Sequence, residues 1–251
     1  MCRHLAYLGP PATLAELLLE PPHSLARQSW APADMRGGGT VNADGFGVGW
    51  YSAGAAAPVR YRRAVPFWAD PGFADLARTV RSGAVLGAVR SATVGMPLTE
   101  GACAPFGSDG WLFSHNGLIK GWPDSMRALA GGLPVTDLLT LDASMDSALL
   151  WALVRDRLSA GQDMAKAAGE VVTEVARTAP GSRLNVLLTD GQAIVATTWT
   201  HSLSVLHGDG AVVVASEPHD DDARWTSVPD GHLLTATVDS VQLHNLEIGE
   251  R

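Results

Sequence analysis

Cys2 is the residue of this 251-residue chain whose position most directly suggests chemistry. It follows the initiator methionine, and because cysteine is small, removal of Met1 would leave a residue that carries both a thiol and a free α-amine. An α-amine has a reference pKa of about 7.7–8.0, so a fair fraction is unprotonated at neutral pH and can accept the thiol proton. Nucleophile and general base would then belong to one residue, as in N-terminal nucleophilic catalysis.

Two other interpretations of Cys2 stay open from its position alone. The residue could be a small buried side chain that begins a strand. Strand alternation would also place Cys2 and His4 on the same face, which suggests a Cys–His dyad. Side chains two apart on one strand point in parallel, however, and seldom meet at hydrogen-bonding distance.

A second group of candidate residues lies at 113–117, where the sequence reads Phe-Ser-His-Asn-Gly at the end of a predicted strand. Asn116 offers a side-chain amide and Gly117 a backbone N–H. Together they could form an oxyanion hole, which needs two donors aimed at one developing charge. An Asn-Gly pair is more often simply a turn. Here it leads into residues 118–122 and a predicted helix rather than into an obvious hairpin.

Several familiar motifs are missing from the sequence. It contains no Gly-x-Ser-x-Gly elbow and no Gly-x₄-Gly-Lys-Ser/Thr phosphate loop. Glycines alternate at 45–49, but Trp50 and Tyr51 continue a strand where a dinucleotide fold would begin a helix. The eight histidines show no zinc-ligand spacing, and residues 219–222 (His-Asp-Asp-Asp) are interpreted as an acidic surface loop.

Composition and charge exclude several classes of protein. The formal net charge is −8 at pH 7 with no cluster of Lys or Arg, which argues against nucleic acid because phosphate binding needs a clustered basic face. Only Cys2 and Cys103 are cysteines, so a disulfide scaffold is excluded. Two free thiols are compatible with a reducing compartment. No secretory signal is visible, and the longest apolar stretches, such as 84–89, are too short to cross a bilayer. We expect a cytoplasmic protein with no membrane segment.

The elements that must position these residues can be read from hydrophobic periodicity and turn residues. Strands are predicted at 2–8 (ending at a Gly-Pro-Pro break), 46–51, 59–65, 84–90 and 111–117, and six more short strands between 183 and 247. Helices are predicted at 13–20, with Thr13 as N-cap, and at 70–83, 143–161 and 162–179. A Gly-rich loop is expected at 36–45. Many strands with a few long helices favour an α+β layered fold in one domain.

Five segments together make the chain resemble a known family. They are Met-Cys-Arg-His-Leu at the start and the residues at 42–50, 89–93, 114–117 and 145–147. In type and order they are similar to the class II glutamine amidotransferase-type domains of the N-terminal nucleophile hydrolase superfamily, over about the first 150 residues. The resemblance implies a four-layer αββα sandwich, a single domain over residues 2–251 with Met1 removed, and Cys2 at the end of a central strand.

The resemblance also implies catalytic roles for three residues. Cys2 would be the nucleophile and, through its own amine, the base. Asn116 and Gly117 would form the oxyanion hole. No metal or organic cofactor is needed for this chemistry.

Four further residues would bind the substrate. The resemblance assigns Arg90 to the α-carboxylate of a γ-glutamyl group and Asp146 to its α-ammonium, and it places Thr93 and His115 at the same site. A planar guanidinium just past a buried strand can grip a carboxylate bidentately, although a strand-end arginine is common. Asp146 near a helix start could also be an ordinary first-turn acid. The family commonly has a histidine where Ala104 stands, and Cys103 is expected to be a bystander.

The implied reaction is cleavage of a γ-glutamyl amide through a glutamyl thioester. We expect no synthetase domain, so a small hydrolase that releases an amine is favoured over an enzyme that passes ammonia onward. The opening residues, 89–97 and the tail from Ala215 are most similar to the ergothioneine-biosynthesis amidohydrolases, which remove glutamate from γ-glutamyl-hercynylcysteine sulfoxide. Two alternatives are a glutaminase subunit serving a separate synthetase and a non-catalytic γ-glutamyl-binding protein.

The α-amine mechanism predicts the mass of the active protein. Intact mass spectrometry of an active preparation is expected to give a chain that begins at Cys2, because only a free amine on that residue can accept the thiol proton. A preparation that keeps Met1, or carries an acetylated terminus, and still turns over substrate at full rate would contradict the mechanism.

Overall fold

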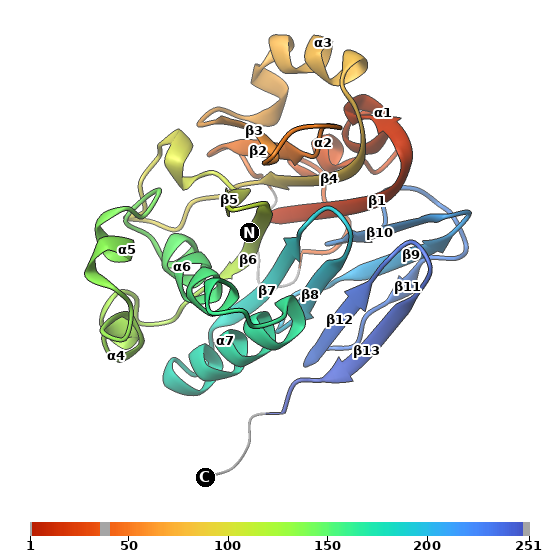
Figure 1. Cartoon of the computed structure of the whole chain (residues 1–251). Helices are drawn as coiled ribbons and strands as arrows, with labels where there is room; N and C mark the ends of the chain where they lie inside the picture. The colour runs from red at the N-terminus through yellow and green to blue at the C-terminus, as the bar shows by residue number, and fades with distance from the viewer. Residues whose placement is uncertain (1, 36–40, 248–251) are drawn as a thin grey trace.

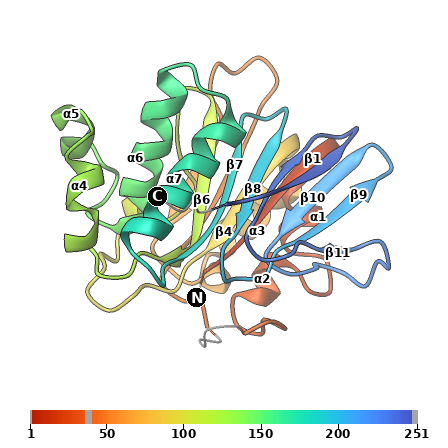
Figure 2. The ribbon, with the colours of Figure 1, turned by 90° about the horizontal axis from the view of Figure 1, so that it is seen from below.

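The computed structural model describes residues 2–35 and 41–247. The predicted removal of Met1, and part of the predicted loop at 36–45, therefore concern residues outside the described ranges. Two antiparallel sheets lie face to face, and helices cover the outer side of each (Figures 1 and 2). The predicted αββα sandwich is confirmed.

The two sheets take strands from both halves of the chain. The first sheet has the order β11-β9-β10-β1-β4-β2-β3, with bounds Thr226–Ser227, Ser204–Gly208, Ala211–Ala215, Arg3–Thr13, Arg81–Val89, Phe46–Trp50 and Val59–Arg63. The second has the order β13-β12-β8-β7-β6-β5, with bounds Val241–Asn245, His232–Ala236, Ile194–Thr198, Arg183–Thr189, Trp111–Leu118 and Phe106–Ser108. The strands predicted at 46–51 and 59–65 are present and pair as β2 and β3, and the six predicted strands of the last third are present as well.

Three apolar layers hold the sandwich together. Neighbouring residues on one strand point to opposite faces, so Val85 of β4 packs under the helices whereas Leu86 packs against the second sheet. Leu187 of β7 meets Leu86 in the layer between the sheets, and Leu188 faces the helices on the other side. This double-sided burial explains why these strands read as continuous apolar runs.

The helices form two groups. The first sheet is covered by α1, α2 and α3 (Leu14–Leu18, Leu25–Gln28 and Pro71–Thr79), and the second by α6 and α7 (Asp146–Ser159 and Met164–Thr178). Shorter pieces are α4, α5, η1, η2 and η3 (Arg127–Ala130, Val135–Leu139, Phe67–Ala69, Glu100–Ala102 and Asp124–Met126). Thr13 caps α1 as predicted, because its Oγ1 accepts the Glu16 N–H at 3.1 Å.

β1 is longer than the sequence predicted. The expected break at residues 9–11 does not end the strand, which continues to Thr13. Its register with β4 shifts between Leu8 and Ala12, so the two prolines lie in an irregular part of the ladder, where proline is tolerated. β1 lies between β10 and β4, and it begins at Arg3, so Cys2 lies at the end of a central strand.

The Asn-Gly pair of β6 is not a turn. β6 runs from Trp111 to Leu118, and Asn116 and Gly117 lie opposite Asn185 and Leu184 of β7. Pairing with β7 therefore overrides the local turn preference. The helix expected after residue 122 is reduced to η3 and the four residues of α4.

Candidate active site

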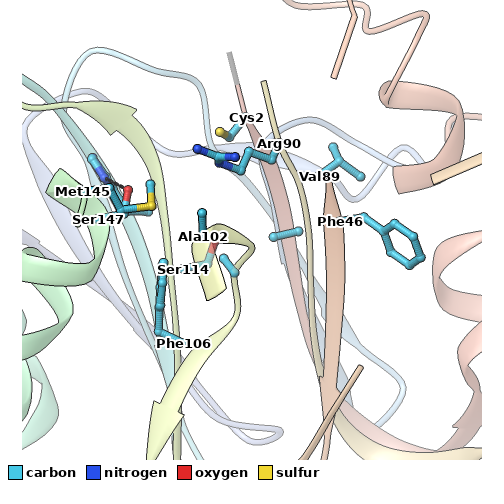
Figure 3. Close-up of a pocket in the computed structure, with 12 residues that line it drawn as sticks. Cys2, Phe46, Val89, Arg90, Ala102, Phe106, Ser114, Met145 and Ser147 are labelled. Atoms are coloured by element: carbon cyan, nitrogen blue, oxygen red, sulfur yellow. Dashed lines mark hydrogen bonds between the residues drawn. The ribbon is translucent and has the colours of Figure 1, made fainter. Parts of the chain in front are cut away.

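A cavity opens between the ends of the two sheets (Figure 3). Cys2 lines it from the start of β1, Arg90 from the residue after β4, His115 from β6 and Ser147 from the first turn of α6. Antiparallel pairing of Arg3 with Val89 brings Cys2 beside the chain that leaves β4. The structure thus brings together three of the predicted site residues, Cys2, Arg90 and His115.

The Cys2 thiol is half-buried and donates to the Ser91 carbonyl at 3.8 Å. His4 does not form the alternative dyad: its Nδ1 lies 3.2 Å from Ser114 Oγ, and within the described residues no hydrogen bond joins it to Cys2. Burial, with His115, His201 and Arg3 nearby, lowers the pKa of His4 to about 3. A neutral imidazole with so low a pKa is a poor general base near pH 7.

Arg90 presents a buried guanidinium to the cavity. Only 5% of the residue is exposed, and Nη1 donates to the Asp44 carbonyl at 3.5 Å. In the described part of the chain Nη2 has no hydrogen-bond partner. Figure 3 shows the side chain extending toward the side of the cavity where Met145 and Ser147 lie. Because a buried cationic donor without a partner is costly, this geometry fits an anionic group of a ligand.

The segments at 42–45 and 89–93 hold Arg90 in place. Arg90 N–H donates to the Gly45 carbonyl at 2.8 Å, and its carbonyl accepts the Asp44 N–H at 3.0 Å. The Asp44 carboxylate accepts the Ala92 N–H at 2.8 Å. The stretch around Asp44 therefore fixes the backbone on both sides of Arg90.

His115, Ser147 and Asp146 form a buried chain of polar groups. His115 Nε2 donates to the Arg183 carbonyl at 2.9 Å, and Nδ1 lies 2.9 Å from Ser147 Oγ. Burial lowers the pKa of His115, so the neutral ring accepts the Ser147 hydroxyl proton. The Asp146 carboxylate accepts the Ser147 N–H at 2.7 Å and the Ile119 N–H at 3.0 Å. Both ring nitrogens of His115 are thus occupied.

Asp146 and Thr93 line a second cavity, with residues 118–123 along one side. The predicted substrate-binding residues are therefore divided between two cavities, and Ser147 of the first is bonded to Asp146 of the second. Ser147 had no predicted role, although it belongs to the 145–147 segment that matched the family pattern. Nothing in the sequence separates the role of Ser147 from that of Asp146.

Asn116 and Gly117 lie on β6 and line neither cavity. Asn116 is fully buried, and its Nδ2 lies 3.5 Å from Ser216 Oγ. A Cβ added to Gly117 would lie 1.8 Å from the Arg183 carbonyl oxygen and 2.6 Å from His115 Nε2. No side chain fits at 117 without moving backbone, so a glycine is required here on packing grounds.

Cys103 is buried outside the first cavity, and its thiol donates to the Arg63 carbonyl at 3.3 Å. Burial raises the pKa of this thiol to about 11, so it is protonated and unreactive at neutral pH. Ala104, where the family pattern commonly has histidine, does line the cavity.

The described helices are short by membrane standards: within residues 2–35 and 41–247 none is long and apolar enough to span a bilayer.

The fold and the site correspond to a known family. The family of class-II glutamine amidotransferases matches residues 19–209, which is more than half of the chain. The chain belongs to this family, as the sequence segments predicted.

Individual relatives narrow the comparison. A protein of Mycolicibacterium smegmatis named gamma-glutamyl-hercynylcysteine sulfoxide hydrolase is 44% identical over 234 residues, 93% of this chain and 95% of the relative. A Mycobacterium tuberculosis protein of the same name is 40% identical over 247 residues, 98% of this chain and 97% of the relative. A solved glutamine aminotransferase class-II domain protein from Silicibacter pomeroyi superposes with a TM-score of 0.70 at 25% identity, covering 98% of this chain and all of that one.

The buried histidines predict a loss of stability in mild acid. Burial lowers the pKa of His4 to about 3 and that of His201 to about 4, whereas an unfolded histidine titrates near 6.5. Below that value the unfolded chain binds more protons, so the stabilisation present above about pH 6.5 is lost as the pH falls toward the folded pKa. Each such histidine should lower the free energy of unfolding by about 1.4 kcal/mol per pH unit.

Urea unfolding between pH 7.5 and 5.5 measures this slope. The slope should be reduced in His201→Gln and retained in His244→Gln, whose histidine is exposed on β13. An unfolding free energy that stays constant over this range would contradict the assignment.

Proposed function

We propose that this chain hydrolyses γ-glutamyl amide bonds with Cys2 as nucleophile, and that its substrate is γ-glutamyl-hercynylcysteine sulfoxide. The observation that carries the proposal is the cavity where the Cys2 thiol and the buried Arg90 Nη2 face the same space. A nucleophile beside a carboxylate-binding group suits an acyl donor with a free α-carboxylate. The names of the two mycobacterial relatives support the choice of substrate.

In the proposed first half-reaction, the α-amine of processed Cys2 takes the thiol proton and the thiolate attacks the γ-carbonyl carbon. The carbonyl oxygen becomes an oxyanion, which accepts hydrogen bonds from the Asn116 amide and the Gly117 N–H. Collapse of this intermediate breaks the C–N bond. The departing amine takes the proton back from the α-ammonium, leaving a glutamyl thioester on Cys2.

In the second half-reaction, the α-amine accepts a proton from water as the water attacks the thioester. The same two donors stabilise the second oxyanion. The C–S bond then breaks, the thiolate regains its proton, and glutamate leaves. The chemistry uses only groups of this chain and water, in line with the expectation that no cofactor takes part.

The glutamyl group itself would be held at its two charges. Arg90 would bind the α-carboxylate, and Asp146 the α-ammonium. The Asp146 carboxylate has about four lone-pair sites; the backbone N–H groups of Ser147 and Ile119 occupy two of them, and Ser147 Oγ lies 3.3 Å from Oδ1. Capacity for an ammonium group therefore remains. Thr93 lines the same cavity as Asp146, which supports a shaping role there.

Replacing the thiol tests the nucleophile. Cys2→Ala is expected to lower glutamate release from γ-glutamyl-hercynylcysteine sulfoxide by at least about 10³-fold, since no acyl-enzyme can form. Cys103→Ala is the matched control, because it removes the other thiol without touching the cavity. Release by Cys2→Ala at the wild-type rate would contradict Cys2 as the nucleophile, whereas a wild-type protein that binds the substrate and releases no glutamate would favour the γ-glutamyl-binding alternative.

The same assay separates the hydrolase from a glutaminase subunit. The wild-type protein should prefer γ-glutamyl-hercynylcysteine sulfoxide over free glutamine by a wide margin in kcat/KM. Preference for glutamine, with activity that rises when a synthetase is added, would favour the glutaminase alternative.

Substitution of Arg90 tests recognition of the glutamyl group. Arg90→Gln removes the charge that would meet the α-carboxylate and should lower kcat/KM by roughly 30-fold to several thousand-fold, about 2–5 kcal/mol, chiefly through KM. Arg90→Lys should restore part of the loss, because an ammonium keeps the charge but not the bidentate fork. Arg62→Gln, whose guanidinium faces Asp142, is the control. An unchanged KM in Arg90→Gln would contradict the role.

A further inference from the structure

Ser216 occupies the position immediately after β10, in a tail segment to which the mechanism gives no role. It is completely buried. Its backbone N–H donates to the His4 carbonyl at 2.9 Å, which continues the ladder between β10 and β1. Its side chain points into the space between the two sheets, because its Oγ contacts a residue of each.

Two donors converge on the Ser216 hydroxyl. The His4 N–H donates to Oγ at 3.0 Å, and Asn116 Nδ2 lies 3.5 Å from the same atom. His4 is two residues after Cys2 on β1, whereas Asn116 is on β6 of the other sheet. One hydroxyl therefore connects the nucleophile's strand with the side-chain donor of the proposed oxyanion hole.

The Asn116 amide needs a hydrogen-bond partner, such as the Ser216 hydroxyl, to fix its orientation. A primary amide has two N–H groups on Nδ2, so Ser216 can accept one and leave the other for an oxyanion. Asn116 Oδ1 has no hydrogen-bond partner among residues 2–35 and 41–247. Within those residues, the contact with Ser216 is the hydrogen bond that the structure gives the amide group of Asn116.

We propose that Ser216 is a positioning residue that orients the Asn116 amide toward the oxyanion while fixing its distance from the Cys2 strand. The inference rests on the proposed function, because it assigns Ser216 a part in the same reaction. Ser216 touches no substrate atom. It acts through Asn116, so its loss should weaken transition-state stabilisation and leave substrate binding intact.

A purely structural role is the competing explanation. Ser216 also accepts the His4 N–H, so its removal could displace β1 and Cys2 with it. The two roles differ in what they change: a displaced β1 alters the reactivity of the Cys2 thiol, whereas a misaimed Asn116 alters only turnover. They differ also in coupling, because a positioning residue has no effect once the group it positions is absent.

The test is a double-mutant cycle of Ser216→Ala and Asn116→Ala, assayed by glutamate release. Ser216→Ala should lower kcat about 10-fold, a fraction of the 10²–10³-fold expected when an oxyanion donor is removed, with KM changed less than about 2-fold. In the Asn116→Ala background it should have no further effect beyond about 2-fold. Ser204→Ala, which removes a largely buried hydroxyl one register position away on β9, should resemble wild type.

Alkylation of Cys2 by iodoacetamide gives a second readout, and the outcomes are separable. Wild-type and Ser216→Ala proteins should be alkylated at equal rates. The proposal would be overturned if the alkylation rate of Ser216→Ala fell in proportion to its kcat. It would also be overturned if Ser216→Ala lowered kcat equally in the Asn116 and Asn116→Ala backgrounds. If Ser216→Ala fails to fold, Ser216→Cys replaces it in the test. The cysteine keeps the shape of serine but is a weaker acceptor, so its kcat should fall by less than the 10-fold expected for alanine. A wild-type protein that releases no glutamate would defeat the proposed function instead, whereas full activity in a folded Ser216→Ala defeats only this inference.

Discussion

The candidate site depends on the antiparallel register of β1 between β4 and β10. Arg3 lies opposite Val89 and Leu5 opposite Ala215, so the start of β1 falls beside Arg90 on one side and Ser216 on the other. A terminal residue would ordinarily be the least ordered part of a chain. Here two ladders fix the strand that follows it. A shift of one residue would turn Cys2 from the cavity toward the helices.

The end of the sandwich where Cys2 lies differs in chemistry from the rest of the sheet interface. Most of that interface is apolar, as at Leu86 and Leu187, but His4, Ser114 and Asn116 meet at the Cys2 end. Buried polar groups are costly unless their hydrogen bonds are made. Networks of this kind favour the one arrangement in which partners meet, so the polar end helps to fix how the sheets sit on one another.

Much of the fold could be predicted, because double-sided burial leaves apolar runs such as 84–89 that periodicity detects. The prediction was wrong at residues 10 and 11, where two prolines suggest a break, yet a register shift absorbs both residues within β1. The strand predicted at 111–117 is confirmed, although an Asn-Gly pair alone suggests a turn, because β7 pairs with Asn116 and Gly117.

The candidate site was predictable to a different degree. Cys2 could be picked out by its type and position, and Arg90 by the family resemblance, and the structure brings them to one cavity. Ser216 could not, since its partners lie 100 and 212 residues away and a serine in a tail carries no local signal. The catalytic and binding roles, the removal of Met1 and the single domain over residues 2–251 stay predictions.

The surroundings of Cys2 give a physical reason for assigning the base to its own amine. His115 and His4 are both engaged elsewhere. His115 bonds through both ring nitrogens, and His4 bonds to Ser114 while burial lowers its pKa to about 3. The Cys103 thiol is protonated and donates to the Arg63 carbonyl.

Within the described residues the hydrogen-bond partner of the Cys2 thiol is the Ser91 carbonyl, and a carbonyl cannot take the thiol proton. An amine on the same residue is the acceptor that needs no further side chain. A neutral His115 at the cavity also avoids a positive charge that would compete with Arg90 for the α-carboxylate in the proposed binding mode.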